Sequence, residues 1–414
     1  CMVMKEGYKQ TEVGVIPDNW EVNSIKSVCK LVNGRGFKPF EWKTSGLPIV
    51  RIQNLNGSEE YNYYQGAYDK KIEIEKGQLL FAWSGSRGTS FGPHIWNGSL
   101  ALLNYHTWKV VVNKDVIASD FFFHALNLLT KRIEDSAHGA SALVHTQKWE
   151  MEGFKFAFPP TLTEQTAIAT ALSDTDELIQ SLEKLITKKR LIKHGALQEL
   201  LKPKENWVEK SLDELFAFSG GLTASREQLS DKGLAYLHYG DIHGSKKSYI
   251  DIEREYADIP KLDVPLNKVP SATLLGDGDL VFVDASEDDE GTSRHVVIKN
   301  PNAMPYIAGL HTIVAKSTND LVDKNYRQYC FQSNDVKRQF KFYAVGTKVS
   351  GVSKSNIGKI LLTLPPTNDE QRRIAASLSD MDAELAALEA KLDKYRHIKQ
   401  GMMQELLTGR IRLV

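Results

Sequence analysis

The chain has 414 residues, of which 52 are basic and 52 acidic, so its formal net charge is zero. This length predicts two domains, because one domain usually has about 100 to 150 residues. Hydrophobic residues make up 42% and charged residues 25%, which is typical of a globular protein. The balanced charge excludes a protein that is basic overall, so nucleic-acid binding would have to depend on local features.

Residues 1–20 lack the apolar core of a signal peptide, and no apolar run approaches the ~20 residues of a membrane-spanning helix. The three cysteines, Cys1, Cys29 and Cys330, show no CxxC spacing and cannot all pair within the chain. Reduced thiols are the simplest interpretation. We therefore expect a cytoplasmic protein that makes no membrane contact.

The first part of the chain predicts a mixed α/β module. Short runs of β-branched and aromatic residues, bounded by Gly, Asn or Asp, predict strands at residues 48–55, 78–83 and 107–112. A helix is predicted at residues 119–137 from its apolar periodicity. We call this part module 1.

A long helix follows the double proline that begins at Pro159. Its apolar residues recur at alternating spacings of four and three, at Ile168, Leu172, Ile179, Leu182, Ile186 and Leu200, with Thr175, Lys189, Lys193 and Ala196 on the same seam. Such a heptad pattern predicts a coiled-coil helix that needs a partner. About 40 helical residues extend roughly 60 Å.

The same order then repeats. Strands are predicted at residues 235–242, 279–284 and 311–316 and a helix at residues 325–343, which together form module 2. A second heptad seam follows, comprising Ile374, Leu378, Met381, Leu385, Leu388, Leu392, Tyr395, Lys399, Met402 and Leu406. Residues 159–201 align without a gap on residues 365–407, with 22 of 43 positions identical, so chance is excluded.

This repeat predicts an α+β protein with two mixed α/β modules and two long antiparallel coiled-coil helices, related by a pseudo-twofold internal repeat. An antiparallel pairing is the simplest, because module 2 is crossed between the two helices. The predicted limits are 1–158 for the first module, 159–202 for the first helix, 203–364 for the second module and 365–414 for the second helix.

The two helices also share polar residues outside the seam. One explanation is recent duplication together with helix capping by Ser173 or Thr161. The other is that both helices present the same surface to two copies of one partner. The candidate partner-binding residues are Glu164, Gln165, Asp174, Glu183, Arg190, Glu370, Gln371, Asp380, Glu389 and Arg396.

The two modules are less alike than the two helices. Their strands match in type, whereas their loops differ. Residues 84–94 read "SGSRGTSFGPH", whereas the corresponding residues 285–295 read "ASEDDEGTSRH". Similar scaffolds with different loops indicate two similar acts of recognition on different targets.

The segment "LPPTNDEQRRIAASLSDMDAELAAL...IKQGMMQELLTG" resembles the specificity subunits of type I restriction-modification systems. The double proline, the Glu-Gln-x-x-Ile entry to each helix and the Gln-Glu-Leu-Leu exit occur in both copies, and the resemblance covers nearly the whole chain.

The resemblance implies a subunit without catalytic activity whose modules are target recognition domains, each reading half of a bipartite site in double-stranded DNA. It implies that the helices set the gap between the half-sites and that two adenine methyltransferase subunits dock on the chain. Restriction endonuclease/translocase subunits would join the same complex. No cofactor is expected in this chain, because AdoMet, ATP and Mg would belong to those partner subunits.

DNA reading requires side chains that bond base edges or phosphates. In module 1 the candidates are Asn33, Arg35, Lys38, Arg51, Gln53, Ser86, Arg87, Gln147 and Lys148. In module 2 they are Arg226, His238, Asp241, Lys246, Lys247, Arg294, Lys348 and Lys354.

Enzyme functions find little support in the sequence. The segment "NPNAMPY" (residues 300–306) is not the catalytic tetrapeptide of an adenine methyltransferase, and no GxxxxGK[ST] phosphate loop occurs. His106 and His311 hold equivalent places, where a structural role is favoured over a catalytic one. The alternative class is a scaffold that does not bind DNA, in which a coiled coil joins two modules for protein or small-molecule ligands.

Overall fold

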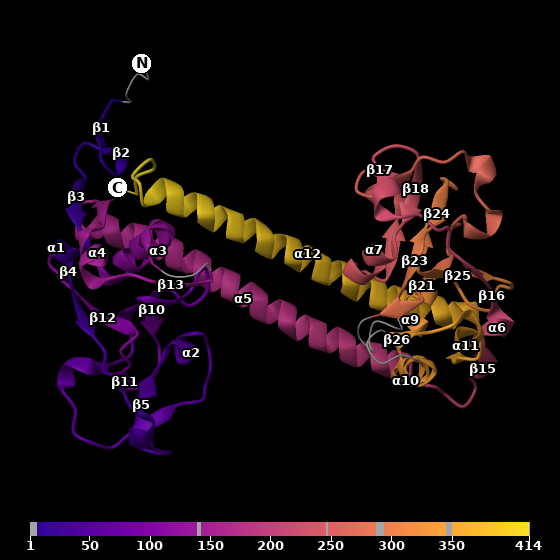
Figure 1. Cartoon of the computed structure of the whole chain (residues 1–414), viewed down its shortest axis with the longest axis horizontal. Helices are drawn as coiled ribbons and strands as arrows, with labels where there is room; N and C mark the ends of the chain where they lie inside the picture. The colour runs from indigo at the N-terminus through magenta and orange to yellow at the C-terminus, as the bar shows by residue number, and fades with distance from the viewer. Residues whose placement is uncertain (1–5, 139–141, 246, 287–293, 345–349, 414) are drawn as a thin grey trace. The chain divides into compact units, whose positions relative to one another are not determined.

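Figure 1 shows the computed structural model, which describes residues 6–138, 142–245, 247–286, 294–344 and 350–413. The chain divides into two compact units, unit 1 with residues 1–183 and 390–414 and unit 2 with residues 184–389. Each unit thus joins one module to about half of each long helix. The limits predicted for the recognition domains alone stay a prediction.

Two four-stranded sheets form the centre of module 1, in the orders β10-β8-β12-β4 and β6-β5-β11-β7. Shorter ladders pair β1 with β2, β3 with β14 and β9 with β13. The strands are β1 (Tyr8–Thr11), β2 (Gly14–Pro17), β3 (Glu21–Ser24), β4 (Cys29–Asn33), β5 (Leu47–Val50), β6 (Asn62–Tyr64), β7 (Glu73–Ile74), β8 (Gln78–Ala82), β9 (Ser84–Ser86), β10 (Gly92–Trp96), β11 (Ala101–Leu103), β12 (Thr107–Val112), β13 (Leu143–His145) and β14 (Lys155–Phe158).

The main helix of module 1 is α3 (Ser119–Ser136), in agreement with the predicted span. Its buried face includes Phe121, Phe122, Leu126 and Ile133, which join the core formed with β4, β8 and β12. The shorter helices are α1 (Ile25–Val28), α2 (Ile52–Leu55) and α4 (Lys148–Gly153), with 3-10 turns η1 (Pro39–Glu41) and η2 (Lys70–Ile72).

Module 2 repeats this plan with a five-stranded sheet, β16-β25-β21-β23-β19, and a four-stranded sheet, β17-β20-β18-β24. The parallel pair of β18 and β24 corresponds to the parallel pair of β5 and β11 in module 1. The strands are β15 (Val208–Ser211), β16 (Phe216–Gly220), β17 (Leu229–Ser230), β18 (Leu234–Leu237), β19 (Tyr249–Asp251), β20 (Lys261–Leu262), β21 (Leu280–Val283), β22 (Ala285–Ser286), β23 (His295–Lys299), β24 (Tyr306–Ala308), β25 (Thr312–Ser317), β26 (Ser350–Gly351) and β27 (Leu361–Leu364).

The predicted helix at residues 325–343 is interrupted and forms two helices. Helix α9 (Arg327–Cys330) ends before Ser333, whose side chain accepts a hydrogen bond from the backbone N–H of Val336 and caps α10 (Asn334–Tyr343). A serine is favoured at a helix start because its hydroxyl satisfies an unpaired N–H group. The other helices of this module are α6 (Leu212–Leu215), α7 (Tyr239–Gly244), α8 (Ile252–Glu255) and α11 (Lys354–Gly358), with 3-10 turns η3 (Arg226–Gln228), η4 (Leu266–Lys268) and η5 (Ser271–Thr273).

Two predicted strands are shorter than expected. The strand predicted at 48–55 ends at Val50 and that at 235–242 ends at Leu237, and each is followed at once by a short helix. Each strand ends because a side-chain oxygen accepts a hydrogen bond from the backbone N–H three residues earlier, which turns the chain into a helix. Asn54 accepts from the backbone N–H of Arg51 at 3.0 Å, and Asp241 accepts from that of His238 at 3.1 Å.

The long helices are α5 (Leu162–Leu200) and α12 (Asn368–Leu406), each unbroken over 39 residues. In unit 1 the early part of α5 pairs with the late part of α12, and in unit 2 the late part of α5 pairs with the early part of α12 (Figure 1). Partner numbers rise on one helix as they fall on the other, so both pairings are antiparallel. The predicted fold class is therefore confirmed.

Equivalent ion pairs connect the two helices in each unit. They are Asp176 with Lys399 and Glu183 with Arg396 in unit 1, and Asp382 with Lys193 and Glu389 with Arg190 in unit 2. Because these side chains remain partly exposed, each pair is expected to contribute less than about 1 kcal/mol. The pairs explain how lysines are accommodated on the seam, since Lys189 also pairs with Glu384.

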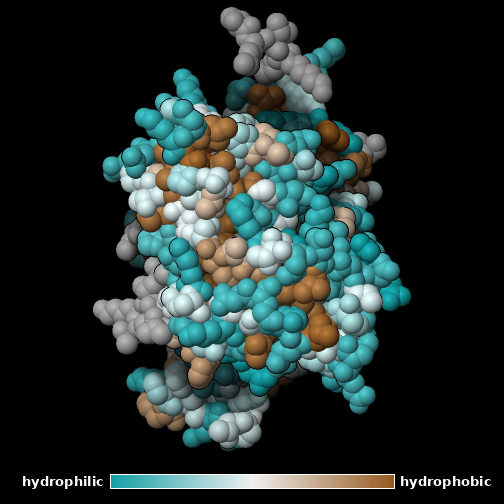
Figure 2. Space-filling model, turned by 90° about the vertical axis from the view of Figure 1, so that its right-hand side faces the viewer, coloured by the Kyte–Doolittle hydropathy of each residue, from teal (hydrophilic) through white to brown (hydrophobic). Residues whose placement is uncertain are grey.

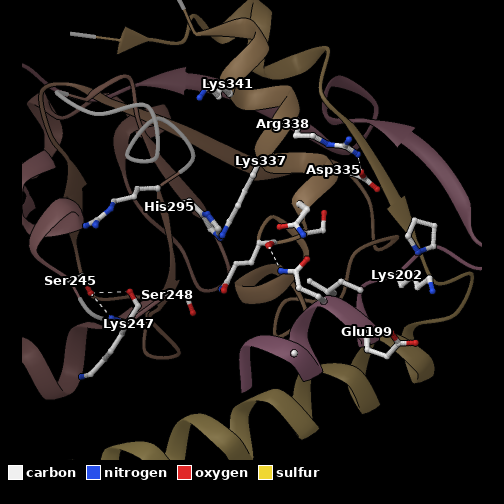
Figure 3. A pocket seen from close by; sticks show the side chains of 18 of the residues that line it. Glu199, Lys202, Ser245, Lys247, Ser248, His295, Asp335, Lys337, Arg338 and Lys341 are labelled. Carbon is white, nitrogen blue, oxygen red and sulfur yellow. Dashed lines mark hydrogen bonds and ion pairs between the residues drawn. The ribbon is translucent and has the colours of Figure 1, made fainter. Parts of the chain in front are cut away.

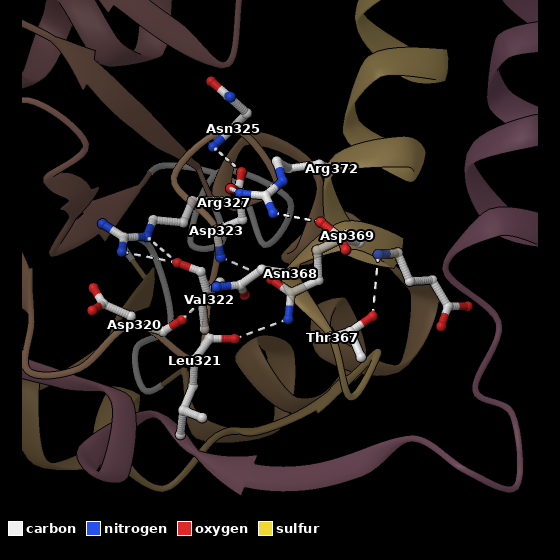
Figure 4. Close-up of polar contacts among 12 residues, drawn as sticks. Asp320, Leu321, Val322, Asp323, Asn325, Arg327, Thr367, Asn368, Asp369 and Arg372 are labelled. Carbon is white, nitrogen blue, oxygen red and sulfur yellow. Dashed lines mark hydrogen bonds and ion pairs between the residues drawn. The ribbon is translucent and has the colours of Figure 1, made fainter.

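The start of each long helix is clamped to its own module by a buried glutamine. Gln371 donates to the carbonyl groups of Leu321 (2.8 Å) and Pro365 (3.1 Å) and accepts from the backbone N–H of Asp323 at 2.8 Å. The loop that it clamps lies beside Asn368 and Arg372 in Figure 4.

Gln165 makes the equivalent three bonds in unit 1, to Val116 and Pro159 and from the N–H of Ala118. Both glutamines are no more than 1% exposed, so their side chains are engaged inside the unit, and the partner-binding role predicted for Gln165 and Gln371 stays a prediction. A buried polar side chain needs hydrogen-bond partners, and a glutamine at each position supplies the same three bonds in both units.

The face of the molecule drawn in Figure 2 is mostly hydrophilic, with small brown hydrophobic areas separated by teal residues. Among the described residues, no helix is long and apolar enough to cross a lipid bilayer.

Candidate nucleic-acid interface

An open groove of about 1170 Å³ lies in unit 2 between the end of α5 and module 2. Its cationic side chains come from four separate segments and are Lys202, Lys247, Arg294, Lys337, Arg338 and Lys341. Among the residues that the structure describes, the acidic ones that line it are Glu199 and Asp335. We call this the basic groove; its excess of positive charge suits a phosphate backbone, although the whole chain is neutral.

Some of these cations already have partners. Arg338 is turned toward Asp335, as Figure 3 shows, while Lys247 pairs with Glu255 at 3.1 Å. Arg294 donates to the carbonyl oxygen of His243. Lys337 points toward the middle of the groove beside His295 (Figure 3).

Helix α10 supplies three of the six cations. Its buried side is formed by Val336 and Phe340, which leaves Lys337 and Lys341, four residues apart, on the outer side. The sequence-based candidates did not include these lysines or Lys202. The pattern "VKRQFKFY" could have identified the lysines of α10, whereas no local signal marks Lys202.

Two of the predicted DNA-binding residues of module 2, Lys247 and Arg294, both line the basic groove. Lys354 lies elsewhere, exposed at the start of α11. Lys246 and Lys348 lie outside the described residues.

Three other candidates of module 2, Arg226, His238 and Asp241, line a second concavity of about 310 Å³ together with Leu229, Ser230 and Pro260. We call it the recognition hollow. Burial lowers the pKa of His238 and raises the pKa of Asp241. A concavity lined by titratable groups whose pKa values are shifted is a candidate functional site.

In module 1, Arg35 and Arg51 both reach strand β6. The guanidinium of Arg35 lies over the ring of Tyr64 at 4.8 Å and pairs with Glu41. Arg51 donates to the side-chain oxygen of Asn62 at 3.1 Å and lies over the ring of Trp42 at 5.1 Å. The structure thus brings these two candidates to one strand.

The remaining module 1 candidates lie on or beside five other elements, β4, η1, α2, β9 and α4. Asn33 ends β4, Lys38 precedes η1 with its amine 5.8 Å from the centre of the Phe40 ring, and Gln53 is exposed on α2. Ser86 ends β9 and Arg87 follows it, exposed. Gln147 caps α4, and Lys148 donates to the carbonyl oxygen of Leu31 at 2.8 Å.

The equivalent histidines differ in their surroundings. The ring of His106 lies 3.8 Å from that of Tyr105, and burial lowers its pKa. His311 has a left-handed backbone (φ 59°) and contacts Asp284 at 3.2 Å. Among the described residues no group of three or more His, Cys, Asp or Glu side chains is arranged to hold a metal ion.

The predicted partner-binding residues on the helices fall into three groups. Gln165 and Gln371 are buried, as noted above. Glu164 pairs with Arg412 and is also buried, whereas Glu370 pairs with Lys204 at 2.8 Å. Glu183, Arg190, Glu389 and Arg396 form the ion pairs between the helices, and Asp174 and Asp380 are exposed.

Comparisons with known proteins agree on one family. The chain is 25% identical over 430 residues to the putative type I restriction enzyme MjaX specificity subunit of Methanocaldococcus jannaschii, covering 99% of this chain and 97% of that protein. It is 30% identical over 177 residues to the type I restriction enzyme EcoBI specificity subunit of Escherichia coli, covering 41% of this chain and 36% of the other.

The fold is shared with solved structures. The type I restriction-modification S subunit from M. genitalium superposes with a TM-score of 0.59 at 16% identity, covering 97% of this chain and 99% of that one. A sequence profile described as "Type I restriction modification DNA specificity domain" matches residues 17–190 and 204–394. The chain therefore belongs to the family of type I restriction-modification DNA specificity subunits.

Proposed function

We propose that this chain is the DNA-reading subunit of a type I restriction-modification complex, in which each module reads one half of a bipartite site. The basic groove is the observation that carries the proposal, because six cations from four segments meet in a protein of zero net charge. The chain itself catalyses no reaction; AdoMet, ATP and Mg belong to the methyltransferase and endonuclease/translocase subunits. The two long helices set the gap between the half-sites.

Co-expression with the cognate methyltransferase, followed by mapping of modified adenines, tests this proposal. We expect a split recognition sequence. Replacing residues 84–91 of module 1 with the corresponding loop of another family member should change only one half of that sequence. A change in both halves, or no DNA-dependent methylation at all, would contradict the proposal.

Some residues shared by the two helices are buried or form ion pairs between the helices, so they are weaker candidates for docking two methyltransferase subunits. The exposed identical pairs that remain include Lys188 and Lys394 as well as Ile192 and Ile398. Ile192 is 48% and Ile398 40% exposed, so both helices keep an apolar side chain at the same exposed position.

A repeated glycine lies three residues after each of these isoleucines. A Cβ atom added at Gly195 or Gly401 would meet no atom within 4 Å, so internal packing does not require glycine there. Glycine inside a helix costs about 0.5 to 1 kcal/mol relative to alanine. Close approach of a partner's backbone would explain why both copies keep it. Gly195 is also one of the residues that line the basic groove, which would place the partner beside the DNA.

Replacing one isoleucine, Ile192→Glu or Ile398→Glu, should therefore reduce the complex from two methyltransferase subunits to one, and the double variant should bind none. A charge on an apolar docking face leaves an unpaired buried group. Light scattering after size-exclusion chromatography measures the stoichiometry. Leu191→Glu is the matched control, because Leu191 is 69% exposed but is not repeated in the second helix. Two subunits on the double variant would overturn this assignment.

A further inference from the structure

The recognition hollow lies where β18 ends and α7 begins. His238 is the first residue after β18, and its Nδ1 atom accepts a hydrogen bond from the backbone N–H of Gly240 at 3.0 Å. In the neutral ring the proton is therefore on Nε2. The backbone N–H of His238 donates to Oδ2 of Asp241 at 3.1 Å, which holds the carboxylate of this lining residue in place.

Two polar groups of the hollow have capacity left for a ligand. Within the described part of the chain, neither the guanidinium of Arg226 nor Oδ1 of Asp241 makes a hydrogen bond or an ion pair. Arg226 is exposed, and one of its terminal nitrogens lies about 3.4 Å from where a Cβ atom at position 240 would be. A donor fork and an anionic acceptor thus line the same concavity.

The backbone beside the hollow is strained. His311 adopts a left-handed conformation, with φ of 59°, and its ring lies edge-on to the ring of Tyr239 at 5.5 Å. Tyr239 directly follows His238 and contacts its ring at 4.4 Å. Non-glycine residues with a left-handed backbone are often found at functional sites. The conformation is unfavourable, so it persists only where the surrounding structure holds it.

At the equivalent place in module 1 the side chains already have hydrogen-bond partners. Asn54 occupies the position of Asp241, but its amide nitrogen donates to the carbonyl groups of Ser58 (3.1 Å) and Glu60 (2.9 Å), and the side chain is 7% exposed. Arg51, at the position of His238, is bonded to Asn62. The unpaired acceptor is therefore a feature of module 2 that the shared fold does not require.

We propose that Arg226 and Asp241 read one G·C base pair in the major groove of the half-site bound by module 2. This inference rests on the proposed function. Guanine presents two acceptors, O6 and N7, that match a guanidinium, and the paired cytosine presents its N4 amino group as a donor beside them. An arginine and an aspartate at one site satisfy all three groups together. An A·T pair lacks the second purine acceptor for the arginine and presents no pyrimidine donor to the aspartate.

The test uses the complete complex and a library of DNA duplexes randomised in both half-sites. Wild-type protein should require G·C at one position of one half-site. Arg226→Lys keeps the charge but loses the planar fork, and Asp241→Asn keeps the size but loses the anionic acceptor. Each substitution should reduce discrimination at that single position by about 5- to 150-fold, with little change at other positions.

Arg254→Lys serves as the control, because this arginine of the same module has a side chain that is 85% exposed and does not line the hollow. A bipartite site whose module 2 half contains no G·C pair, or an A·T pair at the affected position, would overturn the inference and leave the proposed function intact. A complex that methylates no bipartite site would instead overturn the proposed function.

Discussion

Replacing Lys202 and Lys337 with glutamine should weaken DNA binding by the assembled complex to a similar extent for every DNA sequence. Each lysine that neutralises a phosphate releases counterions, so the slope of log affinity against log salt concentration should decrease by about 0.9 per lysine, or about 2 for the pair. Both residues line the basic groove, and neither forms an ion pair among the described residues. Fluorescence anisotropy over a series of salt concentrations measures the slope.

Lys268→Gln provides the charge-matched control for this experiment. Lys268 is exposed on module 2 but does not line the basic groove, so the salt slope should stay as in the wild type. An unchanged slope in the double variant would show that DNA does not follow the groove. A loss of affinity for only some sequences would assign these lysines to base reading instead.

Truncating Leu172 or Leu378 to alanine should destabilise the corresponding unit by about 2 to 5 kcal/mol, because each substitution leaves a cavity in a closely packed core. The two leucines hold equivalent positions and are 0% exposed. Leu172 packs in the core of unit 1 with Leu406 and Leu407, and Leu378 packs in the core of unit 2 with Leu197. Hydrogen exchange measured by mass spectrometry reports the two units separately.

Each of these variants is a control for the other, since Leu172→Ala should accelerate exchange mainly in unit 1 and Leu378→Ala mainly in unit 2. Leu191→Ala supplies the exposed comparison on the same helix and should change stability by no more than about 0.5 kcal/mol. A cost below about 1 kcal/mol for both buried leucines would show that the helices are not integral to the unit cores.

The repeat and the periodicity of the sequence were sufficient to predict the two modules, the two long helices and their antiparallel pairing. The seam from Ile374 to Leu406 was readable because a heptad pattern is local and is repeated many times. The structure also corrects local details. The strands expected at 48–55 and 235–242 stop early because Asn54 and Asp241 accept backbone hydrogen bonds that begin a turn.

The interpretation of shared residues depended on tertiary structure. The sequence predicted a partner-binding role for Gln165 and Gln371, and the structure shows that each of them clamps a module to its helix by internal hydrogen bonds. Identity between two copies states only that both positions serve the same purpose. Burial helps to distinguish packing within the chain from binding to a partner. The two glutamines are buried, whereas Ile192 and Ile398 are exposed.

The sequence by itself determined that this is a duplicated chain with matching helices and divergent loops. Tertiary structure alone decided which of its charges act together. Lys202 and Lys341 are 139 positions apart and come to one groove only through the packing of α10 near the end of α5. Long-range contacts of this kind leave no periodic trace in the sequence, because the residues between them fold as separate elements with patterns of their own.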